Sequence, residues 1–215
     1  MIDHEPVDIM GVIDFPNPNK DERVIRFIDS EYHTLFTIKD GESIVITRFD
    51  GEKMVFPCKY IDDCHVCIGN SAYHICEFAE MQERNGNTYG PSAPKISAEI
   101  GTYEIYQIPA IADVDYCFQP YAEAKGKLQN ADYQRSYAGM YAKENSLENL
   151  WAKHNRDSRP FAHRMRSMSV SDIVVLTQDG KKTAYYADTI GFKEVPEFLA
   201  QQRVQKKHRE RGEAR

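Results

Sequence analysis

The sequence lacks any long apolar run. No stretch approaches the roughly 18–20 apolar residues that cross a bilayer. The first residues, MIDHEPVDIMG, have neither the basic start nor the apolar core of a signal peptide. We therefore expect no membrane contact and a cytoplasmic protein. The 215 residues are 41% hydrophobic and 28% charged, which is typical of a globular chain with one large domain or two small ones.

The familiar catalytic signatures are also missing. There is no G-x-S-x-G nucleophile elbow, no P-loop, no G-x-G-x-x-G fingerprint and no H-E-x-x-H zinc motif. The sequence therefore predicts no catalytic residues, no cofactor-binding residues and a protein that is not an enzyme.

Cysteine is scarce, and its number is odd. A secreted disulfide scaffold is usually shorter and evenly paired, so the five cysteines are expected to be reduced. One stretch gathers four thiols and two imidazoles: Cys58, Cys64, His65, Cys67, His74 and Cys76. Only Cys64 and Cys67 have finger-like spacing, and Cys76 falls on the apolar side of a predicted helix. Ordinary cysteines with no metal are thus the preferred interpretation, and structural zinc is the alternative.

Charge is unevenly distributed along the chain. The net charge is −6, yet the tail Arg203–Arg215 holds six basic and two acidic residues. The remaining 202 residues are therefore strongly acidic, and an acidic body repels nucleic acid. We expect contact with nucleic acid only through the basic tail. A solvated acidic surface is the default interpretation, and an acidic face that competes for the basic groove of a DNA-binding protein is the alternative.

The front of the chain predicts a small α+β domain over residues 23–86, after an irregular arm at 1–22. Its β-rich runs are Arg23–Ile28, His33–Ile38, Ser43–Arg48 and Lys53–Phe56. Turns at Asp40-Gly41 and Asp50-Gly51 join the last three runs, which predicts an antiparallel meander. A helix from Asn70 or Ser71 to about Asn85 would cover one face of the sheet.

Residues 87–100, rich in Pro, Gly and Ser, predict a linker. A second α+β domain over 101–200 would follow, again a short antiparallel sheet with one or two packed helices, and residues 201–215 would form a basic helical tail. The second domain has a predicted strand at Thr102–Ile108, a helix Leu147–His154 capped by Ser146, and a last helix from Pro196. Tyr133–Tyr141 fits either a helix or a strand, and its many aromatic residues favour the strand.

The clearest local signal is a β-hairpin within Ser167–Phe192. An apolar run ends at Leu176, Asp179-Gly180 supplies the positive φ angles of a tight turn, and Ala184 starts the return strand. Asp172 stands at the strand entry, where a short acidic side chain can bond backbone amides. The fold-determining or contact residues are Ser169, Ser171, Asp172, Tyr185, Tyr186, Asp188 and Phe192.

The region from about Tyr103 to Leu199 resembles the YodL-like domain. The matching segments are LENLW at 147–151, His154-Asn155, RSMSVSDIVVL at 166–176, AYYAD at 184–188 and Gly191-Phe192. The front half is similar to a domain associated with large polyvalent proteins, through FIDS at 27–30, TLFTI at 34–38, PCKYID at 57–62 and YHICEFAE at 73–80.

The resemblance implies a protein of conjugative or other mobile elements of gut Firmicutes. Such domains act beside incoming DNA and blunt host defences. We therefore expect a non-enzymatic accessory protein that works through protein contacts, as an anti-restriction or anti-CRISPR inhibitor of a host nuclease. The alternative is a nucleic-acid-binding accessory factor that uses the basic tail.

Overall fold

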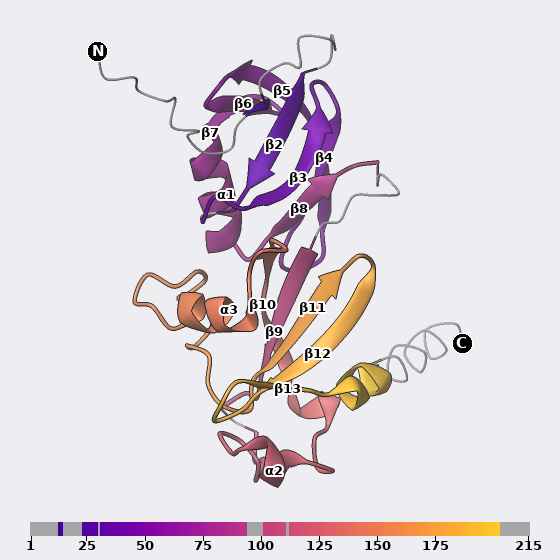
Figure 1. Ribbon diagram of the computed structural model, residues 1–215, viewed down its shortest axis with the longest axis vertical. Coiled ribbons are helices and arrows are strands. Elements are labelled where there is room, and N and C mark those ends of the chain that lie inside the picture. Colours follow the sequence, from indigo (N-terminus) through magenta and orange to yellow (C-terminus); the bar gives the residue numbers. More distant parts are fainter. Residues whose placement is uncertain (1–12, 15–22, 30, 94–100, 111, 203–215) are drawn as a thin grey trace. The chain divides into compact units, whose positions relative to one another are not determined.

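The computed structural model describes residues 13–14, 23–29, 31–93, 101–110 and 112–202 (Figure 1). These residues have the predicted α+β fold, and their strands form three antiparallel sheets, one more than predicted. The chain divides into two compact units, Met1–Thr102 with Gly139–Glu144, and Tyr103–Ala138 with Asn145–Arg215. No helix within the described part of the chain has the length and apolarity to cross a membrane.

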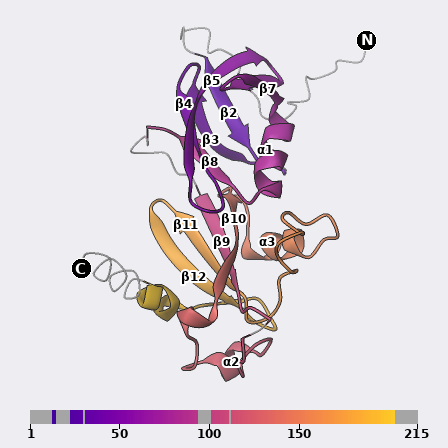
Figure 2. The same ribbon diagram turned by 180° about the vertical axis from the view of Figure 1, so that it is seen from behind.

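The first unit combines two sheets and one helix. A three-stranded sheet has the order β1-β2-β3, and a five-stranded sheet has the order β7-β6-β5-β4-β8. The strands are β1 (Ile13–Asp14), β2 (Val24–Ile28), β3 (Thr34–Lys39), β4 (Ser43–Thr47), β5 (Lys53–Asp62), β6 (His65–Ile68), β7 (Ser71–His74) and β8 (Thr88–Pro91). The helix α1 (Ile75–Arg84) follows β7 directly and lies beside it, as Figure 2 shows.

Aromatic rings fill the core of this unit. Phe27 of β2 stacks on Phe36 of β3 with ring centroids 4.7 Å apart. Phe78 of α1 and Tyr89 of β8 meet edge to face at 5.0 Å, and both contact Phe27. The alternating buried positions of β2 and β4 place one side of each strand on this core. The rings therefore join both sheets and the helix around a single apolar centre.

The predicted meander is wrong at its first turn. The strand β3 pairs with β2, whereas β4 pairs with β5 and β8. The backbone bonds at the turn explain the difference, because the Asp40 amide donates to the Arg23 carbonyl and the Gly41 amide donates to the Cys58 carbonyl. The chain thus crosses here from one sheet to the other. The second Asp-Gly turn does form the predicted hairpin, with Thr47 opposite Lys53.

Two further predictions for the first unit are wrong. Residues 71–74 form a strand rather than the start of a helix, because Gly69, with φ of 63°, turns the chain back so that Ser71 pairs with Ile68. The start of the predicted linker at 87–100 is strand β8, which pairs with β4 and buries Tyr89. Local turn chemistry suggested both assignments, and pairing with distant strands decided against them.

The second unit is built on one five-stranded sheet of order β10-β9-β11-β12-β13. Its strands are β9 (Gly101–Gln107), β10 (Gln134–Tyr141), β11 (Ile173–Gln178), β12 (Lys181–Ala187) and β13 (Phe192–Glu194). The predicted β11–β12 hairpin is confirmed, with Gln178 opposite Lys181 and with Asp179 and Gly180 at φ of 48° and 73°. The predicted strands at β9 and β10 are also present.

Both faces of this sheet are covered (Figures 1 and 2). On one face, α3 (Leu147–His154) packs its His154 ring against Tyr103 and Tyr137. Ser146 caps that helix, as predicted, by accepting from the Asn149 amide. On the other face, Phe198 of the helix at 196–202 packs against Tyr106 and Tyr133. The short elements α2 (Tyr121–Ala124) and η1 (Asn130–Asp132) connect β9 to β10.

Candidate functional site

A fully buried carboxylate, Asp172, stands directly before β11. The side chain of Gln107 donates to it at 2.8 Å and the Ser169 amide at 2.9 Å, while Arg166 donates from both terminal nitrogens. Burial raises the pKa of Asp172, and the charge and hydrogen bonds of Arg166 oppose that rise. These donors hold the loop at 166–172 against β9.

Arg166 in turn supports an exposed aromatic ring. The Phe118 ring centroid lies 5.0 Å from the guanidinium carbon of Arg166, and Phe118 is 56% exposed. Its backbone has φ of 61°, and its amide donates to the Ser171 hydroxyl at 3.0 Å. Ser171 is itself buried with φ of 79°. Such left-handed backbone persists only where the surroundings hold it, so Phe118 is presented rigidly.

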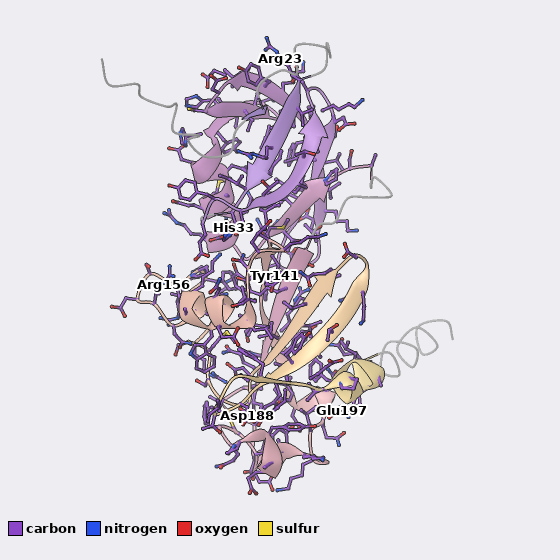
Figure 3. All side chains as sticks on the ribbon, viewed as in Figure 1. Arg23, His33, Tyr141, Arg156, Asp188 and Glu197 are labelled. Atoms are coloured by element: carbon purple, nitrogen blue, oxygen red, sulfur yellow. The ribbon has the colours of Figure 1, made fainter. Side chains whose placement is uncertain are left out.

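The loop at 188–191 is bonded to the segment that carries Phe118 through Asp188, which Figure 3 labels. The Asp188 carboxylate accepts from the Tyr121 amide at 3.0 Å and from the Thr189 amide at 2.8 Å. The Tyr186 hydroxyl donates to the Gln119 carbonyl at 2.7 Å. Ile190, at the tip of the loop at 188–191, is 88% exposed. We call Phe118, Arg166 and Ile190, carried on these hydrogen-bonded loops, the strand-end surface.

The structure brings most of the predicted contact residues to this end of the sheet. They are Ser169, Ser171, Asp172, Tyr186 and Asp188. Two others make different contacts. Tyr185 is paired with Val174 and Glu194 within the sheet, and the Phe192 ring packs against Trp151 with centroids 6.4 Å apart. Sequence reasoning missed Gln107, Phe118 and Arg166 as members of the site, because Phe118 and Gln107 reach it from 53 and 65 residues away.

One imidazole in the second unit is strongly perturbed. His154 is completely buried, and its Nε2 lies 2.8 Å from the Tyr103 hydroxyl. Burial, together with the positive charges of Lys153 and Arg159, lowers the pKa of His154 to about 3. The ring therefore stays neutral inside the aromatic core. A perturbed histidine can mark an active site, but no substrate reaches a ring with no exposed surface.

The predicted thiol and imidazole candidates do not converge on one point. Cys58 is buried in the core, where burial raises its pKa to about 12, and the Cys67 thiol donates to the Gly69 carbonyl. His65 and His74 lie opposite each other on β6 and β7. The side chain of Cys76 lies outside the described residues. Among the side chains that are described, no three His, Cys, Asp or Glu residues gather as metal ligands.

Comparison with known proteins finds a family to which this part of the chain is similar. Residues 102–198 match the family model of the YodL-like domain. This region is therefore similar to the YodL-like domain, as the resemblance predicted, and the strand-end surface lies within it. No curated protein and no solved structure matches the chain.

Proposed function

We propose that the protein is a non-enzymatic accessory protein of a mobile genetic element, and that it acts in the bacterial cytoplasm by binding a protein partner. The observation that carries this proposal is the exposed Phe118 ring on the Arg166 guanidinium. Aromatic and arginine side chains dominate the binding energy of protein interfaces. The hydrogen bonds that fix this loop reduce the entropy lost on binding.

The partner that we propose is a host defence nuclease of the restriction or CRISPR class. The resemblance of the chain to mobile-element proteins supports this class. The charge distribution gives further support, since residues 1–93 carry 17 acidic and 8 basic side chains, against 13 and 12 in residues 101–202. A nuclease must expose a basic groove for nucleic acid, and an acidic segment competes for that groove. The YodL-like domain would supply the apolar anchor.

Establishment of unmodified plasmid DNA tests this function. Isogenic hosts with and without an active restriction or CRISPR system would be transformed while they express the full chain. We expect a rise of at least tenfold in transformants of the defended host and no change in the undefended host. Equal efficiencies with and without the protein, across hosts that represent both nuclease classes, would contradict the proposal.

A basic segment supports a second candidate function, nucleic-acid binding. Residues 153–166 hold five basic side chains and one acidic side chain. Arg156 and Arg164 are exposed on the loop that follows α3, and Figure 3 labels Arg156. The tail Arg203–Arg215, where the sequence predicts this activity, lies outside the described residues. Basic side chains on an exposed loop suit contacts with phosphates.

Fluorescence anisotropy with duplex DNA and with RNA tests this second candidate. We expect the Arg156→Gln/Arg164→Gln variant to weaken binding of every sequence and to reduce the salt slope by about two. The Lys181→Gln/Lys193→Gln variant, which removes the same charge elsewhere in the unit, is the control. Loss of binding only on deletion of Arg203–Arg215 would move the site to the tail, and equal affinities of all variants would exclude both places.

A further inference from the structure

Two histidines face each other on a partly exposed hairpin of the first unit. β6 and β7 are joined by the turn Gly69-Asn70, and the register places His65 opposite His74. Their ring centroids lie 5.4 Å apart, with an angle of 80° between the ring planes. The side chain of His65 is 44% exposed. Both imidazoles are thus paired on one face of a strand pair that an ion in solution can reach.

The spacing matches that of two imidazoles on one metal ion. With a metal–nitrogen distance of about 2.0 Å and tetrahedral angles, two bound rings have centroids roughly 5 Å apart. The observed separation is close to this value.

A carboxylate orients one of the rings. The Asp62 carboxylate, the last residue of β5, lies 2.8 Å from His65 Nδ1 and also accepts from the Cys64 amide at 2.9 Å. With Nδ1–H donated to Asp62, the Nε2 atom of His65 carries the free lone pair. Metal-binding histidines characteristically donate their other ring N–H to a carboxylate in this way. Asp62 therefore fixes both the tautomer and the direction of the ligand.

We propose that His65 and His74 bind one zinc-type divalent ion as a pair, with water in the remaining coordination positions and Asp62 as a positioning residue. Imidazole nitrogen is a preferred ligand of zinc, copper and nickel ions. Mg²⁺, which prefers oxygen ligands, is not expected to bind at this site. The bound ion links β6 to β7, because each strand supplies one of its two histidine ligands. This site is independent of the strand-end surface and of the proposed function.

Calorimetric titration of the reduced full chain with Zn²⁺ tests the site. We expect one ion per chain, with affinity at least tenfold weaker in His65→Ala and in His74→Gln. Asp62→Asn keeps an oxygen for the Cys64 amide but removes the charge, and we expect a loss of about tenfold. His33→Ala is the matched control, because His33 has the same contact with a carboxylate, Asp29, and within the described residues no second imidazole pairs with it.

Thermal unfolding gives a second readout that is independent of the heat of binding. Zn²⁺ should raise the melting temperature of the natural chain and of His33→Ala, but not that of His65→Ala. The proposal is overturned if the natural chain binds no stoichiometric Zn²⁺. It is equally overturned if binding survives in both His65→Ala and His74→Gln, since the ion would then be held by other groups such as the thiols.

Discussion

Asp172 is the residue on which the strand-end surface depends. Its replacement by alanine leaves the Arg166 guanidinium, the Gln107 amide and the Ser169 N–H without their shared acceptor. Removal of one partner from a buried ion pair costs about 3–5 kcal/mol. We therefore expect Asp172→Ala to lower the free energy of unfolding by that amount, measured by chemical denaturation.

Asp157→Ala is the control for this prediction. Asp157 is exposed on the loop after α3, and surface substitutions of this kind change stability by less than about 0.5 kcal/mol. Equal denaturation midpoints for the two variants would show that the carboxylate of Asp172 contributes little.

His154 gives stability a defined dependence on pH. Because its pKa falls to about 3 in the folded protein, the unfolded chain binds the extra proton below the ordinary value of about 6.5. This contribution to stability is complete above pH 6.5. It falls by about 1.4 kcal/mol for each pH unit below that value, down to about pH 3. The free energy of unfolding of the natural chain should therefore be lower at pH 5 than at pH 6.5. We expect His154→Gln to reduce this difference in the free energy of unfolding by about 2 kcal/mol.

The same measurement on His163→Gln separates this effect from general acid denaturation. His163 is exposed on the loop that follows α3 and lies outside the aromatic core, so it is the matched control. If His154→Gln kept the slope of the natural chain, the buried imidazole would have an ordinary pKa, contrary to its position in the core.

At the scale of elements, two glycines are required for different reasons. Gly101 allows two strands to pack closely, and Gly180 adopts a backbone conformation that other residues rarely adopt. A Cβ atom on Gly101 of β9 would lie 2.1 Å from the Tyr141 carbonyl oxygen of β10, whereas a Cβ on Gly180 would meet nothing within 4 Å. Gly180 instead has φ of 73°. We expect Gly180→Ala to cost about 1–2 kcal/mol through backbone strain. Gly101→Ala should cost about 3 kcal/mol or more, because β10 must move.

Comparison of the two free energies of unfolding checks this order. Far-ultraviolet circular dichroism of Gly101→Ala would show whether the β9–β10 pairing survives. A cost for Gly101→Ala no larger than that for Gly180→Ala would mean that the two strands adjust easily.

The elements that the sequence predicts well are those set by neighbouring residues. Asp179-Gly180 supplies the positive φ angles of the hairpin, and Ser146 caps α3. The errors in the first unit share another cause. β8 is defined by pairing with β4, some forty residues away, and β3 leaves the predicted meander to pair with β2. Short-range turn chemistry cannot determine which distant strand becomes the neighbour.

The same division holds for the candidate site. Asp172 could be proposed from its place at a strand entry, because an acidic side chain there bonds nearby amides. Phe118 could not, since an exposed phenylalanine in a loop has no distinctive spacing. Only the fold shows that Arg166 supports its ring and that Ser171 fixes its backbone.

At the scale of the whole molecule, charge and contact chemistry lie in different parts of the chain. The acidic excess is confined to residues before 94, while residues 101–202, which include the region similar to the YodL-like domain, are nearly neutral. Under our account the YodL-like domain anchors the partner through aromatic and apolar contacts, and the acidic segment adds electrostatic specificity. Raised salt should therefore weaken the complex without abolishing it.

Co-purification from a defended host, with Phe118→Ala compared to the natural chain, tests the central claim most directly. Val55→Ala, which removes an apolar side chain that is 60% exposed in the first unit, is the control. The account predicts that a restriction or CRISPR nuclease is retained by the natural chain and by Val55→Ala, and is reduced at least tenfold by Phe118→Ala. Recovery of no such nuclease, or equal recovery by all three proteins, would contradict it.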